Sequence, residues 1–99
     1  MKRLSEIFGE KIYGEFAAFK NRMLQEEPFV IFQCSYEITI KTAMYESLLE
    51  SSQKLGQDAL EGMLSIPRLL AFLYEEWLGA DGTGEEELER FLQEEMEKF

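Results

Sequence analysis

Apolar residues recur three or four positions apart through residues 2–26, the spacing of one face of an α-helix. They are Leu4, Phe8, Ile12, Phe16, Phe19 and Met23. Pro28 predicts the end of this helix, because the residue before a proline avoids the helical backbone conformation. Gly9 and Gly14 lie within it, and each either allows close contact with another backbone or is a tolerated defect.

Residues 29–49 carry two patterns at once. Apolar and polar residues alternate through 30–41, as in a β-strand that is buried on one side. At the helical period of about 100° per residue, the same segment presents two opposite apolar stripes, one including Ile38 and one including Phe32 and Tyr36. A lone strand would leave its backbone groups unpaired unless a second molecule supplied a partner. A central helix buried on two sides is therefore favoured, and a strand is the alternative.

Three further helices are predicted in the second half of the chain. Two begin with the spacing of a capping box, Asp58 with Glu61 and Thr83 with Glu86. Between them, Pro67 is typical of the first turn of a helix at 66–78. The apolar stripe of this helix is wide, so the helix is either the most buried element or half of a dimer interface.

These patterns predict one all-α domain over residues 1–99, a compact bundle of about five helices. The alternative is an α+β fold with one strand at 30–41, possibly paired across a dimer. The hydrophobic content of 45% is that of a globular domain and not of a disordered acidic tail.

Charge is concentrated at one end of the sequence. Residues 74–99 hold ten acidic and two basic residues, a net charge of −8, whereas the first 73 hold ten acidic and eight basic residues, or −2. The total of −10 opposes direct binding to nucleic acid or to anionic lipid, because both would repel the chain. The uneven distribution indicates a protein partner with a basic surface.

The beginning of the sequence lacks the apolar run of a signal peptide, and its longest apolar run, at 29–32, is too short to span a bilayer. The single cysteine, Cys34, forms no internal disulfide and fits a reducing cytoplasm. We therefore expect a cytoplasmic protein without membrane contact.

The sequence contains no histidine, which removes the Ser-His-Asp and Cys-His arrangements of nucleophilic catalysis and most zinc sites. No motif supports an enzyme, and we expect neither a metal nor a cofactor. Cys34 is then expected to be a small buried side chain, and Trp77 a residue of the core.

Two stretches carry a resemblance to a known family. They are Tyr36-Glu37-Ile38-Thr39-Ile40-Lys41 and Leu73-Tyr74-Glu75-Glu76-Trp77, followed by an acidic final helix. With these the chain resembles an uncharacterised family of short acidic proteins, a domain of unknown function from gut Firmicutes and their mobile elements. Where members continue with an acidic pair after the lysine, this chain has Thr42 and Ala43. The resemblance implies a helical middle segment and a phage or plasmid setting, and it supplies no catalytic residues.

The first functional hypothesis is a nucleic-acid mimic that blocks a basic groove of a nucleic-acid-binding protein, as anti-CRISPR and anti-restriction inhibitors do. Carboxylates one helical turn apart, about 5.4 Å, partly imitate the closely spaced charges of DNA. Some acids of the tail are explained by the helix dipole or by ion pairs such as Glu94 with Lys98. The predicted binding face consists of the acids left over, Glu75, Glu76, Asp81, Glu89 and Glu97.

The alternative is a helical adaptor or regulatory protein that acts through an apolar patch, possibly as a homodimer. The candidate contact residues are Tyr13, Phe72, Tyr74 and Leu78.

Overall fold

Six α-helices form the part of the chain that the structure describes, a computed structural model covering residues 3–80 and 84–99. They are α1 (Leu4–Leu24), α2 (Pro28–Gln33), α3 (Ser35–Ser51), α4 (Gln57–Leu64), α5 (Leu69–Gly79) and α6 (Glu85–Glu97). No strand occurs within these two ranges, so the all-α fold is confirmed. The alternative strand at 30–41 is wrong, since its backbone makes helical bonds, such as Ile38 N–H to Cys34 C=O at 2.9 Å.

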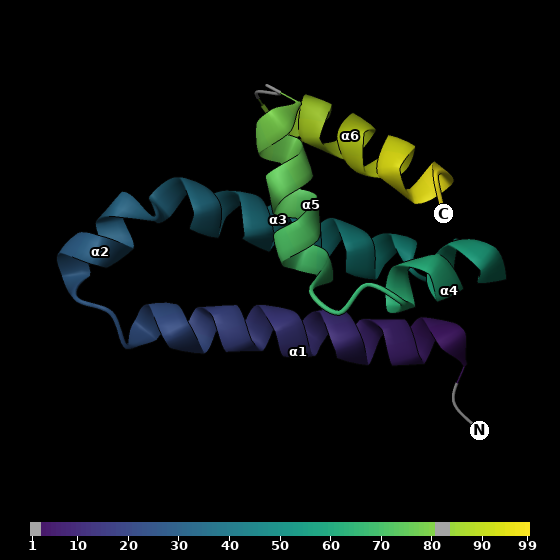
Figure 1. The fold of residues 1–99 in the computed structure, drawn as a ribbon, viewed down its shortest axis with the longest axis horizontal. Coiled ribbons are helices and arrows are strands. Elements are labelled where there is room, and N and C mark those ends of the chain that lie inside the picture. Colours follow the sequence, from purple (N-terminus) through teal and green to yellow (C-terminus); the bar gives the residue numbers. More distant parts are fainter. Residues whose placement is uncertain (1–2, 81–83) are drawn as a thin grey trace.

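The first three helices form a long antiparallel hairpin (Figure 1). α1 ends at Leu24, and Pro28 occupies the first turn of α2, where its missing N–H costs nothing. α2 and α3 then return beside α1. The apolar stripe predicted for α1 faces this hairpin and the helices above it, and Phe8, Ile12 and Phe19 are buried.

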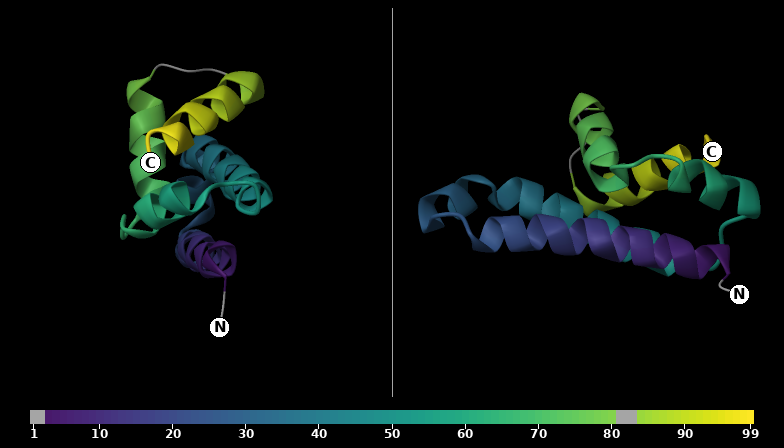
Figure 2. Two further views of the ribbon diagram at one scale, coloured as in Figure 1. Left: turned by 90° about the vertical axis from the view of Figure 1, so that its right-hand side faces the viewer. Right: turned by 60° about the horizontal axis from the view of Figure 1, so that its bottom comes forward.

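The last three helices pack on the hairpin. α4 lies against α1 and α6, while α5 crosses α3 and also contacts α1. In the views of Figures 1 and 2, α6 lies on the far side of α3 from α1. Five of the helices thus surround one core, and α2 extends beyond it at the closed end of the hairpin.

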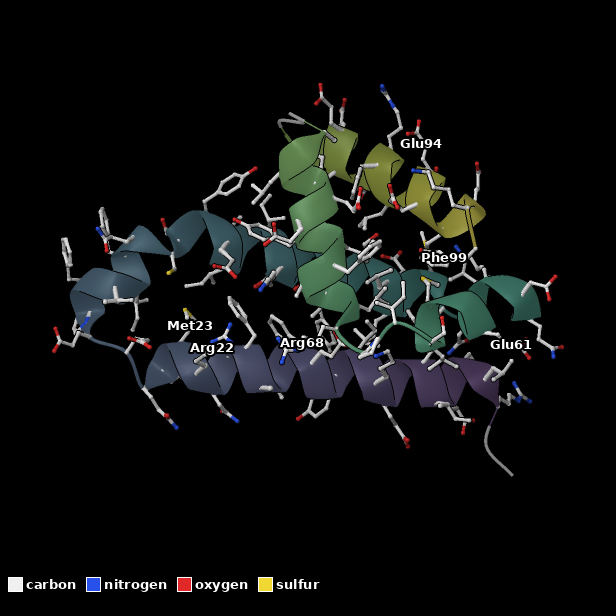
Figure 3. All side chains as sticks on the ribbon, viewed as in Figure 1. Arg22, Met23, Glu61, Arg68, Glu94 and Phe99 are labelled. Carbon is white, nitrogen blue, oxygen red and sulfur yellow. The ribbon has the colours of Figure 1, made fainter. Side chains whose placement is uncertain are left out.

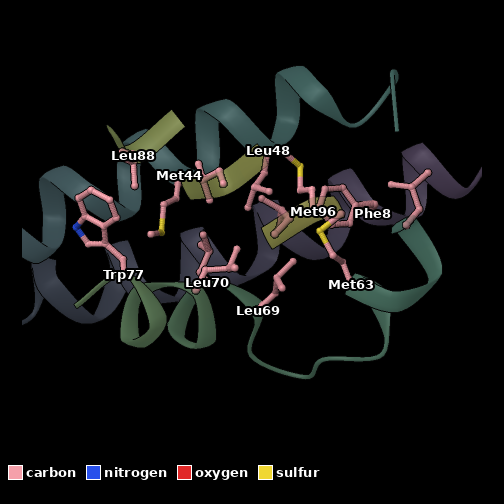
Figure 4. Packing of buried hydrophobic residues seen from close by; sticks show 13 residues of the cluster. Phe8, Met44, Leu48, Met63, Leu69, Leu70, Trp77, Leu88 and Met96 are labelled. Carbon is pink, nitrogen blue, oxygen red and sulfur yellow. The ribbon is translucent and has the colours of Figure 1, made fainter. Parts of the chain in front are cut away.

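The core is a continuous cluster of side chains from all helices except α2 (Figure 4). Its members are Phe8, Ile12, Met44, Leu48, Leu60, Met63, Leu69, Leu70, Leu73, Trp77, Leu88, Leu92 and Met96. Trp77 lies at one end of the cluster, edge-on to Phe91 with ring centroids 5.4 Å apart. Its indole N–H donates to the Tyr36 hydroxyl at 2.9 Å, which satisfies the polar group of a buried tryptophan. The prediction that Trp77 belongs to the core is confirmed.

The segment 29–49 differs from the predicted single helix. The chain bends at Cys34, where α2 ends and α3 begins, and Cys34 is half-buried instead of enclosed in the core. Burial on two sides holds for α3, which lies between α1 and α6, but not for the start of the segment, because Phe32 and Tyr36 are exposed. The reason is that α1, α5 and α6 pack against α3, whereas α2 extends beyond α5 and α6 at the closed end of the hairpin.

The N-terminal caps of α4, α5 and α6 differ from those predicted from the sequence. α4 has Gly56 as its N-cap and no capping side chain, and Glu61 instead accepts a bond from Gln57 at 3.0 Å. α5 begins at Leu69 and not at Pro67. Thr83 lies outside the described residues, and α6 has Gly84 as its N-cap, with a φ of 88° that favours glycine.

Within the described ranges, no helix combines the length and the apolar content needed to cross a membrane.

Candidate protein-binding surfaces

An apolar cleft of about 400 Å³ opens between the C-terminal half of α1 and the α2–α3 arm of the hairpin. Its lining residues are Phe16, Phe19, Lys20, Met23, Leu24, Ile31, Ile38 and Thr42. Thr42 presents no free donor to the cleft, because its hydroxyl donates to the Ile38 carbonyl at 2.6 Å. Lys20 is the one charged residue of this lining, so the cleft suits an apolar ligand.

Large apolar side chains are exposed at the closed end of the hairpin, and one of them, Leu24, also lines the cleft. Leu24, Phe29 and Phe32 are 69%, 68% and 77% exposed. Apolar residues gathered in this way mark interaction sites more often than singly scattered ones do. We call Leu24, Phe29 and Phe32 the apolar tip, and sequence reasoning missed it because it assigned Phe32 to a buried stripe.

A second pocket, of about 330 Å³, lies between α1, α3 and α5 and is rich in basic residues. Arg22, Lys41 and Arg68 line it, together with Glu15 and apolar residues. Figure 3 shows Arg22 over the C-terminal half of α1 and Arg68 just before the beginning of α5. No local pattern predicts this arginine pocket, since the two arginines are 46 positions apart in the sequence and line one pocket only in the folded chain.

Lys41 is held in the wall of the arginine pocket. Its ammonium lies 2.7 Å from a Glu37 carboxylate oxygen and 4.4 Å and 5.4 Å from the ring centroids of Phe19 and Tyr74. A cation over aromatic faces is attracted by their negative charge density, which helps to offset its burial. On the same side of α3, burial raises the pKa of the Tyr74 hydroxyl, and the Glu37 carboxylate raises it further.

An acidic groove of about 190 Å³ runs between α3 and α6. Glu46, Glu50 and Glu89 line it with small and apolar residues, and no basic residue contributes to this lining. Glu46 and Glu50 are one helical turn apart on α3, and Glu89 opposes them from α6. The groove therefore gathers three carboxylates, two from α3 and one from α6, although only Glu89 was predicted from the sequence.

The predicted acidic face is not gathered in one place. Glu75 lines a hollow with Phe72, Glu89 lines the acidic groove, and Glu97 lines another hollow between α4 and α6. Glu76 is exposed on α5, on a side close enough to α6 to raise the pKa of Lys98. Asp81 lies outside the described residues.

Lys98 pairs with a different acid from the one predicted. Its ammonium donates to Glu95 at 3.0 Å instead of to Glu94. This hydrogen bond and the charge of Glu95 raise the pKa of Lys98, although burial acts in the opposite direction. Glu95 is itself buried whereas Lys98 is exposed, and both lie at the C-terminal end of α6, so the pair is an interaction within that end of the helix.

The four residues of the predicted apolar patch do not form one surface either. Tyr13 is exposed on α1, and Phe72 and Leu78 are partly exposed on α5. Tyr74 is half-buried and projects about 200° around α5 from Phe72. The wide apolar sector of α5 is mostly core, since Leu69, Leu70, Leu73 and Trp77 are all buried.

The described residues offer no group of histidine, cysteine and acidic side chains arranged to hold a metal ion. Cys34 is half-buried and lines none of the pockets described above.

Comparisons with known proteins give no match to a family model, to a curated protein or to a solved structure. The resemblance to short acidic proteins of mobile elements therefore stays a prediction.

Proposed function

We propose that this chain is a non-enzymatic protein-binding protein that holds an apolar segment of a partner in the cleft between α1 and α2–α3. The observation that carries this proposal is the exposed apolar tip, of which Leu24 also lines the cleft of about 400 Å³. Leaving Leu24, Phe29 and Phe32 in water is unfavourable, and burial on binding would recover roughly 25 cal/mol for each Å² of apolar surface removed from water. Solubility, which explains exposed acids, does not explain exposed phenylalanines.

The shape of the cleft favours a helical or extended segment as its occupant. On α1 the lining residues Phe16, Lys20 and Met23 follow one another at helical spacing, and Ile31 and Ile38 face them from the other arm. Grooves of this kind bind an amphipathic helix by its apolar face. The function is accordingly that of an adaptor or regulatory protein, the second of the two functions predicted from the sequence, with a different contact surface.

The test is affinity capture from cells that encode the protein, followed by a binding titration with the captured partner. Phe32→Asp places a charge on the apolar tip and should weaken binding at least tenfold. Tyr13→Asp is the matched control, because Tyr13 is 63% exposed but projects from α1 outside the cleft lining, and it should leave affinity unchanged. Retention of every partner by the double variant Phe29→Asp, Phe32→Asp would overturn the proposal.

A second function is supported by the acidic groove, namely inhibition of a nucleic-acid-binding protein by occupying its basic surface. Three neighbouring carboxylates, two on α3 and one on α6, without a basic residue in the lining are the kind of feature that such mimicry needs. A phage or plasmid origin, as for anti-CRISPR and anti-restriction proteins, would fit this function and is part of the same proposal.

Charge-reversal variants test whether the acidic groove or the acidic face predicted from sequence makes the contact with the partner. If the groove binds, Glu46→Lys and Glu50→Lys should each weaken inhibition at least tenfold, while Glu6→Lys on α1 should have no effect. If Glu75→Lys and Glu76→Lys abolish binding and the groove variants do not, the face predicted from sequence is the correct one. Full inhibition by all four variants would exclude mimicry.

A further inference from the structure

The basic residues of this acidic chain are unevenly distributed. The sequence has 20 acidic and 10 basic residues, so acidic partners are plentiful. Three of the ten bases nevertheless line one pocket of about 330 Å³, and Glu15 is the one acid of that lining. The pocket is therefore positive within a protein of net charge −10.

Two of the charges in the pocket are already matched. Lys41 pairs with Glu37 at 2.7 Å. Glu15 accepts one bond from Lys11 at 2.7 Å and another from the Leu70 N–H at 2.8 Å, so Lys11 balances its charge. Glu15 forms no ion pair with Arg22 or Arg68 among the described residues.

Arg22 and Arg68 remain without an ion pair among the described residues. Arg22 has its guanidinium 5.7 Å from the centroid of the Phe19 ring. Arg68 shares a neighbouring hollow with Glu75 but forms no ion pair with it. Two guanidinium groups thus face one pocket with their charges uncompensated.

We propose that the arginine pocket binds a phosphate monoester, held as its dianion by Arg22 and Arg68. A guanidinium presents a planar fork of donors that matches phosphate oxygens. Two uncompensated positive charges balance a dianion, whereas a carboxylate would balance only one of them. The pocket is larger than a phosphate group, and Ala18, Phe19, Leu70 and Ala71 would contact the moiety that carries it. The proposal does not depend on the proposed function, because the lining residues of the pocket and those of the apolar cleft are different except for Phe19.

The test is an NMR titration of the ¹⁵N-labelled protein at constant ionic strength, with inorganic phosphate and phosphoserine in separate arms. Both should give saturable shifts in the amide signals of Ala18, Phe19 and Ala71. Tighter binding of phosphoserine would identify an ester as the natural ligand, and equal binding would identify free phosphate. Affinity should fall when the pH drops from about 7.5 to about 5, because the second pKa of a phosphate monoester is about 6.

Arg22→Gln and Arg68→Gln should each weaken phosphate binding at least tenfold. Arg90→Gln, which changes an exposed arginine of α6 outside the pocket, is the matched control and should bind as the unchanged protein does. Arg68→Lys keeps the charge but loses the fork, so it should bind more weakly than the native chain and more tightly than Arg68→Gln, and it provides a second folded variant. Unsaturable shifts, equal affinity for acetate, or unchanged affinity in both glutamine variants would overturn the proposal.

Discussion

Glu15 joins α1 to the beginning of α5 through a hydrogen bond. Its carboxylate accepts the Leu70 N–H at 2.8 Å, and so caps a helix that lacks a local capping side chain. Lys11, which pairs with Glu15, also donates to the Pro67 carbonyl at 3.2 Å and holds the turn before α5. Glu15→Ala should lower the free energy of unfolding by about 1–3 kcal/mol, because it removes a charged acceptor from a buried donor. Urea denaturation measures this change. Glu6→Ala on the same helix is the control, and its free energy of unfolding should stay within about 0.5 kcal/mol of that of the unchanged protein.

Tyr74 gives the fold a dependence on alkaline pH. Its pKa is raised by burial and by Glu37, so the folded state holds the phenolic proton more tightly than the unfolded state does. The contribution to stability is fully present below pH 10, the ordinary pKa of tyrosine, and is lost as the pH rises through the raised value. In Tyr74→Phe, stability measured by urea denaturation should fall less steeply above pH 10 than in the native chain. Tyr13→Phe should leave the slope unchanged, and an identical slope in Tyr74→Phe would contradict the assignment.

At the scale of the helices, replacing a glycine by alanine tests whether the packing leaves room for a Cβ atom at that position. A Cβ at Gly9 or Gly14 would meet nothing within 4 Å, so these glycines are tolerated defects and not close backbone contacts. Gly9→Ala and Gly14→Ala should each stabilise the protein by about 0.5–1 kcal/mol through better helix propensity. A Cβ at Gly62 would instead lie 2.9 Å from the Cβ and Cδ1 of Phe99, so Gly62→Ala should displace Phe99 and lose this gain. Thermal unfolding of the three variants ranks them directly, and stabilisation by Gly62→Ala equal to the other two would show that Phe99 is not fixed.

The helices themselves could be predicted from the apolar periodicity, but their ends could not. The stripe of α6 and the core position of Trp77 follow from spacing alone, because an amphipathic helix has one way to bury its apolar face. The start of α5 depends on Glu15, which is 55 positions away in the sequence and therefore outside any local pattern. The exposure of Phe32 depends on where α5 and α6 stop covering α3, which is again a property of the assembled fold.

The same limit applies to the candidate sites. Charge counting located the acidic end of the chain, and Glu89, one of the residues predicted for a binding face, lines the groove. Glu46 and Glu50 join it only because α6 packs along α3. The arginine pocket likewise requires three helices to converge, so neither composition nor spacing could predict it.

Over the whole molecule, the apolar cleft and the acidic groove occupy different faces, one between α1 and α2–α3 and the other between α3 and α6. Salt therefore distinguishes the two proposed functions. Attraction between exposed charges is largely screened beyond about 8 Å at physiological ionic strength and beyond about 3 Å at 1 M. Burial of apolar surface is not screened, so a partner held in the cleft should stay bound when salt rises from about 0.05 to 0.5 M.

The decisive measurement is the affinity of one partner for the native chain, Phe32→Asp and Glu50→Lys across this range of salt. Binding through the cleft predicts a nearly flat salt dependence, lost affinity in Phe32→Asp and native affinity in Glu50→Lys. Binding through the groove predicts a steep fall with salt and the opposite response of the two variants, because each lost carboxylate removes an electrostatic contact. A partner whose affinity is salt-sensitive and unaffected by either substitution would place the contact elsewhere, and both proposed surfaces would then be wrong.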